Sequence, residues 1–338
     1  MSEKRPTIYD IAEACGVSAA SVSYVINNKK KVSPQTKEKV LQAMEEMGYA
    51  IDRAASNLSS GRSSLVGVCF PLNSAEQVFS DNPFYSEFLA SFEKEMSING
   101  YDVIVGYIQE TRAFEHWLQT RRLDGVVMFG LYSDETIEMI AHHRIPFVLT
   151  DVYNDIKNVC KIRVDDEKGG YLAGKFLYQN GHRNVAFLGG SLSKSKVDAR
   201  RYNGLCSAAK EYGARTPNLY ETSTTFEGGY QMAKPIAESI DSLSAVMCGS
   251  DIVAIGLMRH LQEMGIAIPE KLSVIGFDDL KECTYVYPAL TTIRQDIARK
   301  GQFAAEALLE AIKYPEATPS ERVLEPELIV RNSTKKMN

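Results

Sequence analysis

From Ser64 onward, short apolar runs alternate with longer segments in which apolar residues recur every three or four positions. Runs of about four to eight apolar residues are typical of buried strands, and the three-to-four spacing is typical of helices that pack on one face. The strands expected on this basis span 65–70, 101–105, 125–129, 146–149, 184–188, 245–248 and 272–276. The helices expected between them lie near residues 84–98, 112–122, 134–143, 167–180, 197–212, 226–239 and 250–264.

This alternation predicts an α/β fold. Strands that are apolar along nearly their whole length are typical of parallel sheets covered by helices on both faces. Roughly 270 residues of such alternation exceed one comfortable doubly wound unit. Ligands of such sheets bind at the carboxyl ends of the strands. We therefore expect two doubly wound parallel α/β lobes with a ligand in the crevice between them.

The first fifty residues predict three short helices with clear start and stop signals. Thr7 can cap the first helix and Gly16 can end it, while Ser33 can cap the third and Gly48 can end it. The apolar positions expected to pack together are Ile8, Ile11, Ala12 and Cys15 in the first helix and Val40, Leu41, Met44 and Met47 in the third. Three such helices form a minimal core.

The second helix is expected to run from Ser18 to Asn27, with Val22, Val25 and Ile26 facing inward. The residues expected to face outward are Ala19, Ala20, Ser21, Ser23, Tyr24 and Asn27. A tight turn at 14–18 followed by a capped helix is what a helix-turn-helix needs, and a small polar face suits the major groove of DNA. An ordinary three-helix bundle with a small-residue surface is the alternative.

Composition places the chain among ordinary globular proteins, with 44% apolar and 24% charged residues in 338. No run approaches the roughly 18–20 apolar residues of a membrane helix, and the N-terminus lacks a secretory apolar core, so a cytoplasmic protein without membrane contact is expected. The net charge is −5, but residues 1–62 carry +2 and the remainder −7. A slightly basic head on an acidic body is the asymmetry expected when only the head meets phosphate.

Motifs for catalysis or metal binding are missing from the sequence. The six cysteines are scattered without a C-x-x-C pair, and the five histidines include no H-E-x-x-H. The sequence also lacks G-x-G-x-x-G, G-x-x-x-x-G-K-[ST] and G-x-S-x-G. The acid pairs Asp165-Asp166 and Asp278-Asp279 are more typical of turns and polar ligand contacts than of a metal site. We expect no enzyme, no metal and no cofactor.

Several motifs occur in one order and spacing along the chain. In the head they are 7–13 (TIYDIAE), 16–18 (GVS), 21–23 (SVS), 25–27 (VIN), 32–33 (VS) and 48–49 (GY). In the body they are 82–84 (NPF), 124–126 (DGV), 181–182 (GH), 276–279 (GFDD) and 288–296 (PALTTIRQD). Together they resemble the lactose-repressor/galactose-repressor (LacI/GalR) family of bacterial transcription regulators, and the resemblance covers essentially the whole chain.

The resemblance implies a division of the chain into three parts. Residues 1–50 would form a helix-turn-helix DNA-binding head, 51–62 a hinge, and 63–338 an effector-binding and dimerisation core similar to periplasmic sugar-binding proteins. The N-lobe would comprise about 63–163 plus 293–321, and the C-lobe about 164–292 plus 322–334.

For DNA, the resemblance implies a homodimer that binds a palindromic operator in double-stranded DNA. The positions that fall where the family contacts DNA are Thr7, Tyr9, Ser18, Ala19, Ala20, Ser21, Ser23, Tyr24, Asn27 and Lys31 in the head, with Ala55 and Leu58 in the hinge. Leu58 would enter the minor groove as an apolar wedge. Tyr24 stands where arginine is common, so we expect an operator that differs from the family consensus at the position read by Tyr24.

For the effector, the resemblance points to the cleft between the lobes. Arg201, Asp278 and Ser250 fall at ligand-contacting positions, with Asp151 a weaker fourth. A guanidinium opposite a carboxylate suits vicinal hydroxyls, which favours a sugar. Phe70, Phe84 or Tyr85 could stack on an apolar sugar face or belong to the core.

The sequence thus predicts a dimeric repressor that a sugar effector releases from its operator. A purine-responsive corepressor-type regulator is the alternative, and a solute-binding protein of transport is a more distant one. The effector, the sign of its action and the operator sequence are not set by the sequence. A dimer is expected instead of a tetramer because the chain ends soon after the strand expected at 328–330.

Overall fold

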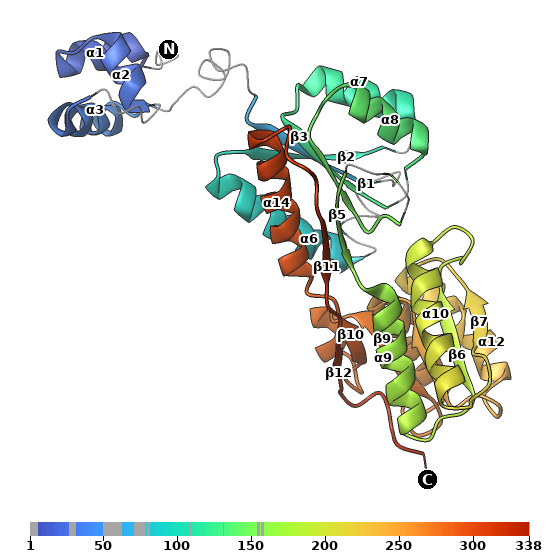
Figure 1. Cartoon of the computed structure of the whole chain (residues 1–338). Helices are drawn as coiled ribbons and strands as arrows, with labels where there is room; N and C mark the ends of the chain where they lie inside the picture. The colour runs from blue at the N-terminus through green and yellow to red at the C-terminus, as the bar shows by residue number, and fades with distance from the viewer. Residues whose placement is uncertain are drawn as a thin grey trace. The chain divides into compact units, whose positions relative to one another are not determined.

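The computed structural model describes residues 6–26, 32–49, 63–70, 79, 82–108, 110–130, 132–153, 156 and 159–337. The chain divides into two compact units, Met1–Ser64 and Leu65–Asn338 (Figure 1). None of the helices in these ranges has the length and the apolar run that a membrane crossing requires.

The smaller unit contains three helices: α1 (Ile8–Cys15), α2 (Ala19–Ile26) and α3 (Pro34–Glu46). The expected punctuation is confirmed, because Thr7 forms a capping box with Asp10, Gly16 ends α1 at φ 65°, and the Ser33 hydroxyl accepts from the Thr36 amide. The core of this unit is formed by Ile11, Ala12, Val22, Val25 and Val40.

Two apolar residues, one in α3 and one directly after it, do not join that core. Leu41 is 49% exposed and Met47 is 38% exposed, so the expectation that they pack inward is wrong. Val40 and Met44 are four residues apart and share one face of the helix, whereas Leu41 is rotated by about 100° from Val40. The inward stripe of α3 is therefore narrower than its apolar composition indicates.

The first sheet of the larger unit has six parallel strands in the order β11-β5-β4-β3-β1-β2. Their bounds are β1 (Leu65–Phe70), β2 (Asp102–Tyr107), β3 (Gly125–Phe129), β4 (Phe147–Thr150), β5 (Cys160–Val164) and β11 (Glu321–Leu324). One face packs on α6 (Pro83–Ile98) and α14 (Ile297–Lys313), the other on α7 (Thr111–Arg121) and α8 (Asp134–His142) (Figure 1).

The second sheet has the order β12-β10-β9-β8-β6-β7 and is parallel except for the β10–β12 pair. Its strands are β6 (Val185–Gly189), β7 (Asn218–Glu221), β8 (Ala245–Cys248), β9 (Ser273–Asp278), β10 (Thr291–Arg294) and β12 (Glu327–Ile329). Its helices are α9 (Asp166–Gln179), α10 (Lys196–Glu211), α11 (Phe226–Gln231), α12 (Ala233–Glu238) and α13 (Asp251–Glu263). The predicted α/β fold with two lobes is confirmed.

The chain crosses between the two sheets three times: from β5 to α9, from β10 to α14, and from β11 to β12. The expected lobe boundaries at 293 and 322 fall inside strands. Residues 291–294 pair with β9 of the second sheet, and 321–324 pair with β5 of the first, so these crossings lie after Arg294 and after Leu324.

Glycines allow α9 and α10 to approach closely. A methyl group on Gly170 would overlap the carbonyl of Arg201, and one on Gly204 would overlap the carbonyl of Glu167. This contact between the helices holds Arg201 beside Asp166, the first residue of α9.

Candidate effector cleft and DNA-binding head

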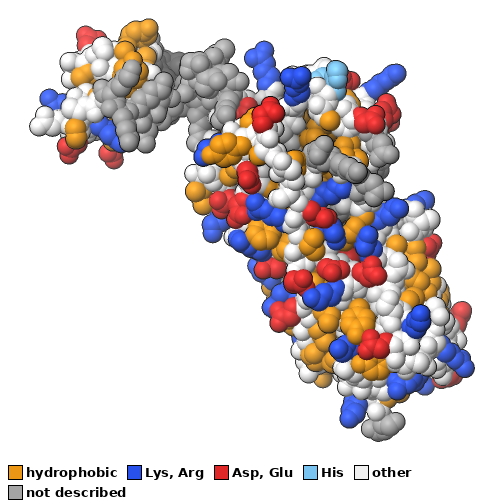
Figure 2. Space-filling view, in the orientation of Figure 1, with side chains coloured by type: hydrophobic (Ala, Val, Ile, Leu, Met, Phe, Trp, Pro, Cys, Tyr) orange, Lys and Arg blue, Asp and Glu red, His pale blue; other side chains and the backbone are white. Residues whose placement is uncertain are grey.

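A cleft of about 630 Å³ lies between the two lobes. Several of its lining residues directly follow parallel strands: Gly130 follows β3, Asp151 follows β4, and Gly249 follows β8. This is the strand edge at which the sequence predicts a ligand. Figure 2 shows acidic and basic side chains interspersed where the lobes meet on the face in view.

Arg201 is the buried cation of the C-lobe side. Its Nε donates to Asp166 Oδ1 at 2.7 Å, its Nη1 donates to the carbonyl of Gly249, and Nη1 lies 3.9 Å from Asp278 Oδ1. Its guanidinium lies 3.5 Å from the centre of the Phe277 ring. Burial alone would lower the pKa of Arg201, but the neighbouring carboxylates outweigh burial and raise the pKa. The guanidinium is therefore charged and held in one orientation.

Asp278 ends β9 and accepts a hydrogen bond on Oδ1 from Gln295 Nε2. Burial of Asp278, opposed by Arg201 and reinforced by the charge of Asp251, raises the pKa of Asp278 to about 8. Its backbone has φ 129°, and Asp151 across the cleft has φ 56°. Strained backbone of this kind persists where the surrounding structure imposes it, and it is common at functional sites.

Asp151 forms the acidic part of the N-lobe side. Its two carboxylate oxygens accept from Lys300 Nζ at 2.7 and 3.0 Å. Burial raises the pKa of Asp151, while Lys300 acts in the opposite direction. Lys300 belongs to α14, so this ion pair joins β4 to the helix that covers the same sheet.

Ser250 precedes α13 and lines the cleft. A serine at this position usually caps the helix by accepting from a backbone amide of the first turn, yet the Ser250 side chain makes no such bond. Its Oγ is buried and has no hydrogen-bond partner among the described residues. Buried hydroxyls are nearly always paired, so this hydroxyl is available to a ligand.

Aromatic side chains line the N-lobe side of the cleft. Phe84 and Tyr85 of α6 and Phe129 at the end of β3 are among the lining residues. Phe70 is not, because it is fully buried and stacks on Phe129 with ring centres 5.1 Å apart. Phe70 therefore belongs to the core, while Phe84 and Tyr85 reach the cleft.

In the smaller unit, the described residues that were expected to contact DNA lie on α1 and α2 or directly before these helices. Tyr9 is 73% exposed, Ala20 is exposed, and Ala19, Ser21, Ser23 and Tyr24 are half-buried. The Thr7 hydroxyl is used in the cap, where it donates to Asp10 Oδ2 at 2.6 Å, and Ser18 Oγ accepts from the Ser21 amide at 3.2 Å. Asn27, Lys31, Ala55 and Leu58 lie outside the described residues.

Comparison with known proteins decides the family. Residues 7–52 match the family described as bacterial regulatory proteins, lacI family, and residues 175–334 match the periplasmic binding protein-like domain. A protein of Vibrio vulnificus (strain CMCP6), named HTH-type transcriptional repressor PurR, is 36% identical over 98% of this chain and 99% of its own length. The chain belongs to the lacI family. Like these relatives, this lacI-family protein is a DNA-binding transcriptional repressor.

Solved structures of lacI-family regulators share the fold. The lac repressor dimer bound to operator and the anti-inducer ONPF has a TM-score of 0.83 at 27% identity, covering 98% of this chain and all of that chain. A regulator from Enterococcus faecium with bound ribose has a TM-score of 0.74 at 29% identity over 81% of this chain and all of its own. The regulator CelR in complex with cellobiose has a TM-score of 0.74 at 26% identity over 97% of this chain and all of its own.

Four residues that the sequence placed at the effector site, Asp151, Arg201, Ser250 and Asp278, all line the cleft of this lacI-family core. Sequence reasoning missed other lining residues: Asn82, Phe129, Lys194, Thr224 and Gln295. Asn82 and Gln295 lie in motifs that carried the family resemblance, so those motifs could have indicated them.

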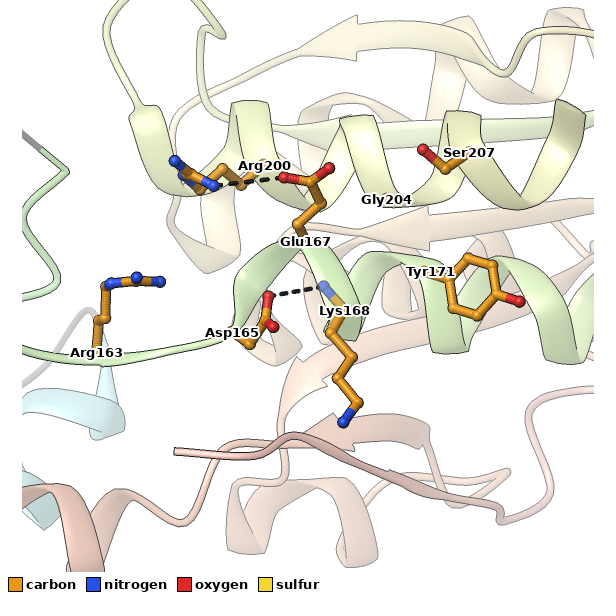
Figure 3. A pocket seen from close by; sticks show the side chains of 8 residues that line it. All are labelled: Arg163, Asp165, Glu167, Lys168, Tyr171, Arg200, Gly204 and Ser207. Atoms are coloured by element: carbon orange, nitrogen blue, oxygen red, sulfur yellow. Dashed lines mark hydrogen bonds and ion pairs between the residues drawn. The ribbon is translucent and has the colours of Figure 1, made fainter. Parts of the chain in front are cut away.

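A second groove, of about 520 Å³, lies on the surface beside α9 and α10 (Figure 3). Its three cationic side chains are each paired with a carboxylate: Arg163 with Glu321, Lys168 with Glu325, and Arg200 with Glu167. Its charges are therefore balanced locally, unlike those of the cleft. Among the described residues, no three His, Cys, Asp or Glu side chains are grouped so as to hold a metal ion.

Proposed function

We propose that the effector of this repressor is a sugar, bound in the cleft between the lobes. The observation that carries the proposal is the division of the cleft into two unlike sides. The aromatic lining residues come from the N-lobe, and the described C-lobe side presents polar groups such as Arg201, Ser250 and Asp278. A sugar ring has one apolar face for an aromatic side chain and hydroxyls that both donate and accept.

A purine corepressor is the second candidate, favoured by the relatives named PurR. A flat aromatic base offers two faces for stacking, yet the C-lobe side supplies Thr224 and Ser250 in place of a second aromatic ring. Structural relatives with bound ribose and cellobiose support the sugar. The cleft chemistry therefore favours a polyhydroxylated ligand over a base.

On DNA, we propose a dimer in which the α2 helices enter successive major grooves of a palindromic operator. Ala19, Ala20 and Tyr24 would read bases, and Leu58 would wedge the central step. Thr7, Tyr9, Ser18, Ser21, Ser23, Asn27, Lys31 and Ala55 would supply the remaining head and hinge contacts. Sugar binding would favour a lobe arrangement that does not hold operator, so the sugar acts as an inducer.

The test is thermal unfolding of the full chain with a panel of sugars and, separately, purine bases and nucleosides. A bound effector at a hundred times its Kd stabilises the fold by about 2.7 kcal/mol, which raises the melting temperature. We expect a sugar to do so and to weaken operator binding. A response to purines alone would overturn the sugar proposal.

Ser250→Ala locates the site. Because the hydroxyl has no hydrogen-bond partner among the described residues, its removal should leave the melting temperature of the free protein unchanged. It should lower the affinity for the sugar about fivefold, as loss of one hydrogen bond does. Ser242→Ala is the matched control, since the Ser242 hydroxyl donates to the Ser239 carbonyl at an exposed turn. Equal sugar affinity in both variants would place the effector elsewhere.

A further inference from the structure

Lys300 is a lysine without solvent exposure beside the effector cleft. Its Nζ lies 2.7 and 3.0 Å from the two oxygens of Asp151 and 2.5 Å from Gln295 Oε1. An ammonium group has three N–H donors, and these three acceptors engage all of them. Asp151 and Gln295 line the cleft, whereas Lys300 lies behind them and does not.

This lysine fixes the orientation of Gln295. Lysine can only donate, so the amide oxygen of Gln295 faces Lys300 and its NH₂ group faces Asp278 Oδ1. Gln295 lies in the crossing from β10 to α14, and Asp278 belongs to the C-lobe. A continuous line of hydrogen bonds thus runs from Asp151 in the N-lobe through Lys300 and Gln295 to Asp278.

The charges around the cleft are unequal. Among the described residues, the side chains of Asp151, Asp198 and Asp278 line it. In the described part of the chain, the buried cations beside the cleft are both paired with carboxylates: Arg201 with Asp166, and Lys300 with Asp151. Lys194 and Lys196 also line the cleft, but they are exposed and their charges are screened by water and salt. An anion in the interior would meet the carboxylates of Asp151 and Asp198, whereas Asp278 holds a proton below about pH 8. Repulsion of this kind weakens binding on the order of a hundredfold in a partly buried site.

We propose that Lys300 restricts the effector to uncharged sugars: it takes up the charge of Asp151 and fixes the amide of Gln295, so the cleft residues that the structure describes offer no spare buried ammonium group to a phosphate or carboxylate. This inference rests on the proposed sugar effector and adds the charge class of that sugar. Lys300 acts through its two neighbours and is a positioning residue.

The first experiment uses matched pairs: ribose with ribose 5-phosphate, glucose with glucose 6-phosphate, and cellobiose with cellobiose 6-phosphate. Binding to the full chain is measured by thermal shift and calorimetry. We expect an uncharged member to bind at least about tenfold more tightly than its phosphate. Tighter binding of a phosphate would overturn the inference but leave the sugar effector standing. No response to any pair would contradict both the sugar effector and this inference.

The second experiment releases the ammonium group. In Asp151→Asn, Lys300 loses its charged partner, so the preference for the uncharged sugar over its phosphate should narrow by about tenfold. Asp241→Asn is the control, because Asp241 pairs with Lys271 at 3.2 Å on the exposed surface, and its preference should equal that of the unmodified protein. In the double variant Asp151→Asn/Lys300→Met no ammonium group is released, so its preference for the uncharged sugar over the phosphate should not narrow in this way. A lysine with a purely structural role would not change this ratio.

Lys300→Met supplies an independent readout. Without the lysine, Gln295 and Asp151 lose their anchor, so the uncharged sugar should bind at least about tenfold more weakly while operator affinity stays within about twofold. Lys313→Met makes the same substitution at an exposed position of α14 and should change neither. Lys300→Met leaves the buried Asp151 carboxylate without its cation, which can prevent folding. In that case the double variant, which also removes this carboxylate, is measured instead of Lys300→Met. If Asp151→Asn binds neither member of a pair, the result with Lys300→Met decides. Unchanged sugar affinity without Lys300 would overturn the proposal.

Discussion

At the scale of single residues, a few buried carboxylates fix the polar groups around the cleft of this repressor. Asp251 is fully buried and holds three groups: its Oδ1 accepts from Thr292 Oγ1, and its Oδ2 accepts from the Leu280 amide and the Cys283 thiol. These bonds fix the loop that follows Asp278. The same burial raises the pKa of both carboxyl groups. The protonation state of Asp278 in the cleft therefore affects the folding stability of the protein.

Asp278→Asn tests this link. The pKa of Asp278 is about 8 in the folded protein and about 4 in the unfolded chain, so between these values the folded state holds the extra proton. Stability of the unmodified protein then falls as pH rises from about 4 to 8, by up to about 1 kcal/mol per pH unit. Asparagine has no proton to lose in this range, so the variant should not be destabilised in this way. The melting temperature of the variant minus that of the unmodified protein should therefore increase from pH 5 to pH 8. A difference that shrinks over this range would contradict the raised pKa.

Sequence reasoning identified cleft residues best where the chemistry suits a ligand. Arg201, Asp278 and Ser250 were expected at the cleft and lie there. Lys300 was missed because a lysine in an amphipathic helix usually lies on the solvated face. The residues around Lys300 in the sequence do not show that Asp151, about 150 residues earlier in the chain, lies close enough to neutralise the lysine charge.

At the scale of elements, the buried strands β1, β3, β6, β8 and β9 are apolar runs and were predicted within two residues. β5 alternates buried apolar residues with partly exposed Lys161 and Arg163, so it lacks such a run. The strand expected at 328–330 is found one residue earlier as β12, but β7, β10 and β11 were missed; each has four residues, and β7 and β11 lie at sheet edges. α14 was also missed, because its buried face consists largely of small residues such as Gly301, Ala304 and Ala305. Short polar strands and alanine-rich faces become evident only once their partners are in place.

Helix α1 offers a test of the local signals that were predicted. Thr7→Ala removes the capping box and should destabilise the head by about 1 kcal/mol. Amide hydrogen exchange in α1 of the full chain should then be about fivefold faster, with operator affinity reduced. Gln42→Ala is the control: it lies at an exposed position of α3, its side chain bonds Glu46 within the same helix, and its loss should leave exchange in α1 nearly unchanged. Equal exchange in both variants would mean that the cap does not support the head.

At the scale of the whole molecule, regulation requires that effector and operator prefer different states of one protein. The hydrogen bonds from Asp151 to Asp278 pass through the crossing at Gln295, so a ligand that contacts both lobes acts on the segment that joins them. Coupling between two sites is reciprocal in free energy. If the effector lowers operator affinity by a given factor, bound operator must lower effector affinity by the same factor.

That reciprocity can be measured directly. Calorimetric titration of the sugar into free protein and into protein saturated with operator duplex should give two Kd values whose ratio equals the sugar-induced change in operator Kd. For a coupling of about 1–3 kcal/mol, the ratio lies between about 5 and 150. A scrambled duplex at the same ionic strength is the control and should leave the sugar Kd unchanged. Tighter sugar binding on operator would reverse the proposed sign and make the sugar a corepressor.

The late return of the chain to its first sheet has a consequence for biosynthesis. Residues 297–313 supply a covering helix and 321–324 an edge strand to a lobe whose other strands emerge from the ribosome before residue 165. Until residues 297–324 have been translated, that lobe exposes an uncovered apolar face and an unpaired β5 edge, both of which favour aggregation. A growing polypeptide of this kind depends on chaperones for longer than one whose domains are completed in sequence, and a prematurely terminated product should be degraded.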